Sequence, residues 1–331
     1  MRATFLWLVS FCLICLAGLC AVGGYGVYAF LKQSPLTDTK SVVIERGIGV
    51  SQIARTLEDQ GIISSALVFH IAARLSADQG LLKAGEYEFT ASMPMARVLE
   101  MIQKGDVVER KFTIAEGLTS HQIVRILNSV AGLEGDITEL PAEGTLLPDT
   151  YHFMKGDTRP QKITEMRAAM TRFMDEIWEQ RAPDLPITTK AQALILASII
   201  EKETSQPDEW HRVAGVFVNR LRLGMPLQTD PTVIYAITQG DIQDAGQGPL
   251  GRRLLSKDLA FDSPYNTYKY PGLPPGPICH PGKNALKAAL NPEKHDYIFF
   301  VADGTGGHLF AKTLDEHNRN VAAWRKIRAG Q

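Results

Sequence analysis

The chain has almost no excess of charge of either sign. Its 331 residues include 35 Lys and Arg against 36 Asp and Glu, so the formal net charge is -1. A nucleic-acid partner requires a clustered excess of Lys and Arg. The composition therefore argues against nucleic-acid binding and indicates a partner that is uncharged or small. A content of 45% hydrophobic and 21% charged residues is that of a folded protein.

Charged side chains are missing altogether from residues 3–31. An apolar helix of this length exceeds the roughly 20 residues needed to cross a bilayer. A cleaved signal peptide has a shorter apolar core of about 7 to 15 residues, so we expect an uncleaved anchor over residues 1–32. Arg2 and the α-amino group precede the span and Lys32 follows it, which favours a cytoplasmic N-terminus by the positive-inside rule. The bulk of the chain then lies outside the cytoplasm.

Cysteine and several catalytic motifs are also scarce or absent. Cys279 is the only thiol beyond the expected span, which excludes an intramolecular disulfide there. The sequence has no H-E-x-x-H and no G-x-S-x-G motif, which argues against a metal-dependent hydrolase and a serine hydrolase. Glycines at 303–307 are followed by no predicted helix, so they do not indicate a phosphate loop. We expect no metal and no cofactor. The histidines left for a metal hydrolase are scattered, and they are His211, His280, His295, His308 and His317.

A polar linker over residues 33–40 precedes a small predicted module at 41–108. A strand at 41–44, a helix at 51–57, a helix ending at Ala73 and an alternating strand at 83–89 follow one another, before a helix at about 95–103. Strand, helix, helix, strand is the order of a LysM-type module, and the resemblance lies in this pattern only. LysM modules bind glycans that contain N-acetylglucosamine, whereas a spacer without ligand is the alternative.

Part of this pattern returns further along the chain. The strand at 112–114, Gly117 and the helix at 122–127 repeat the order of the strand at 41–44, Gly47 and the helix at 51–57. The repeat indicates either a duplicated small module or convergent use of one supersecondary unit.

Residues 109–331 are predicted to form one larger α+β unit. Helices are expected at 163–181, 188–203 and 210–223, the last ending at Gly224. Strands at 297–302 and 308–311 are expected to pair as a hairpin. The fold class is therefore α+β, with an N-terminal transmembrane helix, a small LysM-like module and a larger catalytic domain.

A carboxylate near the end of the apolar run at 194–200 is the strongest candidate for catalysis. Ala197 lies one helical turn before Glu201, so the Glu201 carboxyl is expected beside the buried face, where desolvation raises a carboxyl pKa. A raised pKa suits a general acid near neutral pH. Glu203 also has an apolar neighbour one turn earlier, on a nearly opposite face, so periodicity does not choose between Glu201 and Glu203.

Amides, hydroxyls and tyrosine rings gather in three later segments, at 227–235, 263–268 and 272–278. Rings stack on pyranoses while amides and hydroxyls bond to their polar edges, so this mixture suits a sugar. Each residue taken alone has the simpler explanation of an ordered loop. Asp230, which precedes a proline, either orients substrate or begins a turn or helix.

Together the segments 197–204, 216–221, 227–235, 265–268 and 272–278 resemble the endolytic murein transglycosylase family, also called MltG or YceG-like. The similarity extends over most of residues 40–325. The resemblance implies a lytic cut of the β-1,4 bond between N-acetylmuramic acid and N-acetylglucosamine in nascent strands, which leaves 1,6-anhydro ends and terminates elongation. It implies Glu201 as the catalytic residue, with Glu203 in support. The expected substrate-binding residues are Asn219, Gln228, Thr229, Asp230, Tyr235, Asn266, Tyr268 and Pro274.

The family also implies a location and partners. The protein is expected as a single-pass protein of the inner membrane with a periplasmic catalytic domain, acting on peptidoglycan glycan strands beside peptidoglycan synthases. The alternative is a membrane protein that binds peptidoglycan without catalysis, in which case Glu201→Gln would change no activity.

Overall fold

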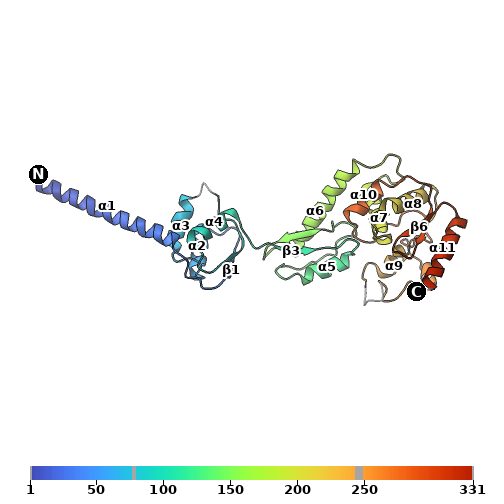
Figure 1. Cartoon of the computed structure of the whole chain (residues 1–331), viewed down its shortest axis with the longest axis horizontal. Helices are drawn as coiled ribbons and strands as arrows, with labels where there is room; N and C mark the ends of the chain where they lie inside the picture. Colours follow the sequence, from blue (N-terminus) through green and yellow to red (C-terminus); the bar gives the residue numbers. More distant parts are fainter. Residues whose placement is uncertain (1, 77–79, 243–248, 330–331) are drawn as a thin grey trace. The chain divides into compact units, whose positions relative to one another are not determined.

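The chain folds as a mixture of helices and short strand pairs, as the sequence predicts. The computed structural model describes residues 2–76, 80–242 and 249–329. It contains two compact units, one of Met1–Arg110 with His152–Gly156 and the other of Lys111–Tyr151 with Asp157–Gln331. The elements are α1 (Arg2–Leu31), β1 (Lys40–Ile44), α2 (Val50–Asp59), α3 (Ala66–Leu75), β2 (Gly85–Phe89), α4 (Met95–Lys104), β3 (Arg110–Thr113), α5 (Ser120–Ser129), β4 (Thr150–Phe153), α6 (Arg159–Trp178), α7 (Lys190–Glu203), α8 (Trp210–Arg222), α9 (Asp230–Thr238), η2 (Ser256–Ala260), α10 (Lys283–Leu290), β5 (Phe299–Ala302), β6 (His308–Ala311) and α11 (Leu314–Ala329) (Figure 1).

The first helix, α1, is the long apolar segment of the first unit. Its 30 residues span about 45 Å at 1.5 Å per residue. The stretch Leu13–Leu31 is long and apolar enough to cross a membrane. In its last turn Ala29 is buried and Phe30 packs against the core of the unit. The helix is therefore joined to this unit by side-chain packing as well as by the linker.

Strands β1 and β2 pair antiparallel and carry helices α2 and α3 between them. Lys40 pairs with Phe89 at one end of the register and Ile44 with Gly85 at the other. The turn after β1 uses Gly47, whose φ of 83° lies in the left-handed region that glycine favours. The predicted order of strand, helix, helix, strand is confirmed. The core of this unit is formed by residues such as Leu57, Ile62, Phe69, Tyr87, Phe89, Val98 and Ile102.

The predicted repeat of strand, glycine turn and helix is also present. Strand β3 pairs with β4, Gly117 turns the chain with a φ of 74°, and α5 follows. The start of α5 has a capping box, in which Thr119 accepts from the Gln122 N–H and the Gln122 side chain accepts from the Thr119 N–H. Duplication of an ancestral module stays a hypothesis.

Helix α7 lies in the interior of the second unit. It contacts α8, α9 and α10, and its residues 195–200 are all buried (Figure 1). This explains why its apolar residues surround the helix and do not form a single stripe. The predicted bounds of α6 were wrong, because this helix begins at Arg159 behind a Thr158 capping box and ends at Trp178.

The last part of the chain is a hairpin followed by a helix. Strands β5 and β6 pair antiparallel from Phe299 with Ala311 to Ala302 with His308, which confirms the predicted hairpin. The predicted first strand began too early, since β5 starts at Phe299. Helix α11 contacts both strands.

Candidate active site

Glu201 lies in the last turn of α7 with a partly buried side chain. Its Oε2 accepts a hydrogen bond of 2.9 Å from the backbone N–H of Gly282, the residue that precedes α10. Gly117 lies on another side of the carboxyl. A Cβ at Gly117 would lie 3.4 Å from Cγ of Glu201. The close approach and the positive φ of Gly117 together explain why a glycine occupies this position.

The surroundings of Glu201 favour its protonated form. Burial raises the pKa of Glu201 to about 7, and the charge of Glu116 acts in the same direction. The Gly282 N–H and the charge of Lys202 oppose the shift. The Lys202 ammonium donates to the carbonyl oxygen of Gly117 at 3.3 Å. A carboxyl with a pKa near neutrality is able both to donate and to accept a proton.

Glu116 is exposed, and its carboxylate lies against Gly282 in the space that a Cβ would occupy there. Glu116 and Glu201 therefore approach the same glycine. The first comes from the loop after β3 and the second from the end of α7.

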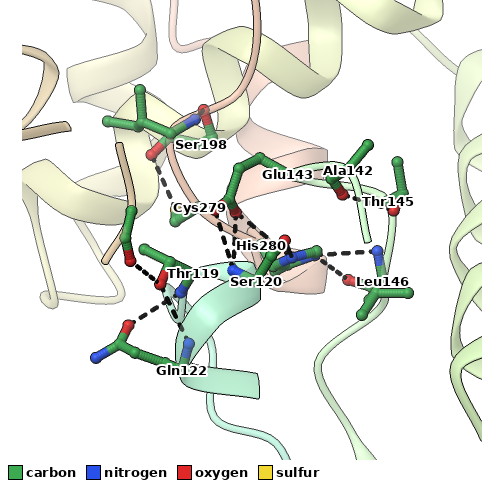
Figure 2. Close-up of polar contacts among 12 residues, drawn as sticks. Thr119, Ser120, Gln122, Ala142, Glu143, Thr145, Leu146, Ser198, Cys279 and His280 are labelled. Carbon is green, nitrogen blue, oxygen red and sulfur yellow. Dashed lines mark hydrogen bonds and ion pairs between the residues drawn. The ribbon is translucent and has the colours of Figure 1, made fainter. Parts of the chain in front are cut away.

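A buried polar network holds the segments that surround Glu201 (Figure 2). His280 is fully buried, and its Nε2 lies 2.9 Å from Oγ of Ser120 and 3.5 Å from Oε2 of Glu143. The Leu146 N–H donates to Nδ1 of His280 at 3.0 Å. Burial lowers the pKa of His280 to about 4, so the ring is neutral. The Leu146 N–H requires an acceptor at Nδ1, and we therefore assign the ring proton to Nε2.

The side chain of Glu143, which belongs to this network, is only 9% exposed. Both of its oxygens accept from the Ser120 N–H, at 3.0 and 3.2 Å, as Figure 2 shows. Burial raises the pKa of Glu143 to about 7. Its partners are groups of the protein interior, so we assign it a structural part in this network.

The backbone around His280 connects the network to Glu201. The His280 N–H donates to the Leu118 carbonyl at 2.8 Å, and the Gly117 N–H donates to the His280 carbonyl at 2.9 Å. Ser198, one turn before Glu201 on α7, accepts from the Ile278 N–H at 3.0 Å. These bonds bring Gly117 and the residues before Gly282 to α7. They fix the two glycines beside the Glu201 carboxyl.

The second glutamate, Glu203, faces different partners. Burial raises the pKa of Glu203 to about 7, the charge of Asp230 acts in the same direction, and Arg220 and the Thr229 hydroxyl oppose the shift. The Tyr268 hydroxyl donates to Oδ1 of Asp230 at 2.7 Å. The Thr229 hydroxyl is buried and makes no hydrogen bond of ordinary geometry within the described parts of the chain. The predicted residues Glu203, Thr229, Asp230 and Tyr268 are therefore brought together.

The remaining predicted site residues either lie near the group formed by Glu203, Thr229, Asp230 and Tyr268 or order the surrounding loops. Gln228 is exposed and adjoins this group, and the Tyr235 ring packs on Tyr265 with centroids 4.9 Å apart. The Asn219 amide donates to the carbonyls of residues 295 and 297, and the buried Asn266 amide donates to those of residues 259 and 261. Pro274 is buried. Both asparagine amides thus donate hydrogen bonds to backbone carbonyls and order the loops that contain them.

Sequence reasoning missed Gly117, Gly282, Glu143 and Ser120, and considered His280 only as a metal ligand. Nothing in residues 131–144 indicated that Glu143, unlike Glu134 and Glu139, is buried. Within residues 2–76, 80–242 and 249–329, no three His, Cys, Asp or Glu side chains gather as a metal ion would require.

Comparison with known proteins places this chain in a family. A model of the YceG-like family matches residues 42–323, and the chain belongs to that family. A Bacillus subtilis protein named endolytic murein transglycosylase is 32% identical over 90% of this chain and 89% of its own length. A Streptococcus pneumoniae protein of the same name is 32% identical over 92% of this chain, which spans 63% of that protein. A solved YceG-like protein from Listeria monocytogenes is 34% identical, covers 86% of this chain and 99% of its own, and superposes with a TM-score of 0.49.

Proposed function

We infer that this protein is a peptidoglycan lytic transglycosylase that cuts within glycan strands. Its membership of the YceG-like family and the names of its curated relatives support this function. The observation that carries it in the structure is the Glu201 carboxyl, which is partly buried, has a pKa of about 7 and accepts from the Gly282 N–H.

The reaction breaks the bond between C1 of N-acetylmuramic acid and O4 of N-acetylglucosamine. Glu201 in its acid form protonates O4 as that bond breaks, and the N-acetylglucosamine unit leaves with a 4-hydroxyl. The C6 hydroxyl of the same muramic residue then attacks C1 and gives its proton to the Glu201 carboxylate. The product is a 1,6-anhydro end, and Glu201 regains the proton that it gave up.

One carboxyl suffices for this sequence of steps. Hydrolytic glycosidases need a second carboxylate about 5 to 9.5 Å from the first, because an enzyme nucleophile or a water must be managed. Here the substrate provides the nucleophile. Glu203 is close in sequence, but its partners are Thr229, Asp230 and Arg220, so we assign it to the wall of the site.

We assign substrate binding to the group around Asp230. Tyr268 and Asp230 form a hydrogen-bonded pair, Gln228 is exposed beside them, and Tyr235 offers a ring for stacking. The buried Thr229 hydroxyl lies close to Glu203. Asn219, Asn266 and Pro274 support this group by ordering the surrounding backbone.

The remaining parts of the chain fit the same proposal. We assign α1 as a single-pass anchor in the inner membrane, with the N-terminus cytoplasmic and residues 109–331 as a periplasmic catalytic domain. Residues 33–40 are the linker and residues 41–108 a LysM-like module, which agrees with the order β1, α2, α3, β2. Peptidoglycan synthases are the proposed partners, and termination of strand elongation is the proposed role.

Mass spectrometry of peptidoglycan digested by the full chain in detergent tests the reaction and the residue together. We expect internal fragments with 1,6-anhydro-muramic ends from the parent and none from Glu201→Gln. Glu179→Gln, an exposed glutamate next to α6, is the matched control and is expected to keep full activity. Reducing ends would instead identify a hydrolase. An inactive parent would favour a protein that binds glycan without cutting it.

A further inference from the structure

Helix α3 of the first unit carries an exposed apolar stripe. Leu67 is 69% exposed, Ile71 49% and Leu75 82%. Residues four apart lie on one face of a helix, so these three side chains form one row along its length. The opposite face is buried, with Phe69 at 0% and Ala73 at 7% exposure. The helix is therefore apolar on two sides, and the core of its own unit covers only one of them.

The stripe belongs to the element that adjoins the proposed membrane anchor. Helix α1 contacts α3 and α4 (Figure 1). In its last turn Ala29 is buried and Phe30 packs against the core of the same unit. The apolar span ends at Leu31. A span that leaves the bilayer within one turn of a packed module keeps that module beside the bilayer surface, so the nearest apolar phase for the stripe is the membrane itself.

The charge carried by α3 itself also suits a lipid surface, although the exposed Glu58 carboxylate accepts from the Ala66 N–H at the start of this helix. Helix α3 contains no Asp or Glu, and its one charged residue, Arg74, is exposed in the last turn. Lys32 follows the span directly. Helices that lie in the membrane interface combine an apolar face with basic side chains, which anionic headgroups attract.

We propose that α3 lies on the surface of the bilayer, with Leu67, Ile71 and Leu75 inserted at the boundary between headgroups and acyl chains. The inference rests on the proposed function of α1 as a membrane span. It adds a second attachment, which fixes the orientation of the residue 41–108 module and not merely its distance from the membrane. A glycan bound by that module would then be held close to the surface where the strand emerges.

Lipid-borne quenching of a fluorophore on the full chain tests this placement. The protein is reconstituted in vesicles of phosphatidylcholine and phosphatidylglycerol, some of which carry a spin label near the glycerol end of the acyl chain and others a spin label near its methyl end, the depth at which Cys20 is expected. The environment-sensitive dye NBD is attached to Ile71→Cys or, separately, to Leu67→Cys. Arg55→Cys, exposed on α2, is the matched control. Cys12, Cys15 and Cys20 are replaced by alanine in these variants, and Cys279 is buried and does not compete for the label.

A fourth protein that retains only Cys20 and Cys279 reports on the anchor. We expect quenching at Cys20, and quenching at both α3 positions that exceeds the control by about twofold or more, because interfacial helices bury their apolar face about 5–10 Å into the boundary region. Quenching at Cys20 with no excess on α3 over Arg55→Cys would overturn the inference while leaving the anchor intact. No quenching at Cys20 would refute both. Fluorescence on α3 that rises only when unlabelled protein is added would identify a second copy as the occupant of the stripe and also overturn it.

Discussion

The interaction between Glu116 and Glu201 gives a quantitative prediction for the pH dependence of catalysis. In the proposed mechanism Glu201 acts first in its protonated form, so the rate is expected to fall as the pH rises through its pKa of about 7. The negative charge of Glu116 holds this pKa up. Glu116→Gln removes that charge, which makes ionisation of Glu201 easier. The alkaline fall in rate should therefore move to lower pH.

The size of the shift follows from the exposure of Glu116. A like charge about 6 Å away in water-like surroundings costs about 0.7 kcal/mol, which corresponds to about half a pKa unit. Because the side chain is exposed, water and salt screen the interaction, so the shift should shrink in 1 M salt, where the Debye length is about 3 Å.

The assay is the initial rate of release of anhydro-muropeptides between about pH 5 and pH 9, for the parent, Glu116→Gln and the control Glu179→Gln. The control is expected to follow the parent. A profile for Glu116→Gln that coincides with the parent at low salt, or that moves to higher pH, would refute the assignment of Glu201 as the acid whose ionisation Glu116 opposes.

Two further predictions concern stability. The pKa of Glu143 is about 7 in the folded protein and about 4.3 in an unfolded chain, so the folded state binds the proton more tightly. Protonated Glu143 therefore contributes to the free energy of unfolding at low pH, and this contribution is lost as the pH rises from about 4.3 to 7. The free energy of unfolding of Glu143→Gln should therefore rise relative to the parent by up to about 3 kcal/mol between pH 5 and pH 8. Urea unfolding followed by tryptophan fluorescence measures this difference, and a difference that stays constant with pH would contradict the prediction. In Gly215→Ala the new Cβ would lie 2.5 Å from the Glu293 carbonyl oxygen. We therefore expect the free energy of unfolding to fall by about 1–3 kcal/mol, whereas Gly→Ala inside a helix usually raises it by roughly 1 kcal/mol. A rise in the same urea assay would show that the segment at Glu293 moves to make room for the methyl group.

Local sequence patterns predicted most of the fold but missed elements whose formation depends on distant partners. Helix α9 begins with Asp230 and Pro231, a pair that is equally typical of a turn, and proline at the first helical turn is compatible with both. Helix α10 has eight residues, of which five are buried against other helices. A helix this short is not stable by its own propensity, so tertiary packing decides it.

The sequence indicated two candidate acids, Glu201 and Glu203, but not the partners of either carboxyl. Periodicity left Glu201 and Glu203 equivalent, and burial indeed raises both pKa values to about 7. What distinguishes them is the donor from Gly282, which is 81 residues away in the sequence, and the pair of Asp230 with Tyr268. Contacts over such separations leave no local signal, so the choice of Glu201 depended on the family resemblance.

Burial alone does not raise the pKa of a glutamate, as a comparison of Glu86 with Glu201 shows. Glu86 is 5% exposed, yet its pKa is lowered, because the Arg110 guanidinium donates to both of its oxygens. Glu201 receives one neutral backbone N–H, while the ammonium of its neighbour Lys202 donates to the Gly117 carbonyl. Burial therefore outweighs the opposing charge of Lys202 in setting the pKa of Glu201. The Gly117 carbonyl accepts from the Lys202 ammonium, so the hydrogen bond of this cation goes to the loop and not to the Glu201 carboxyl.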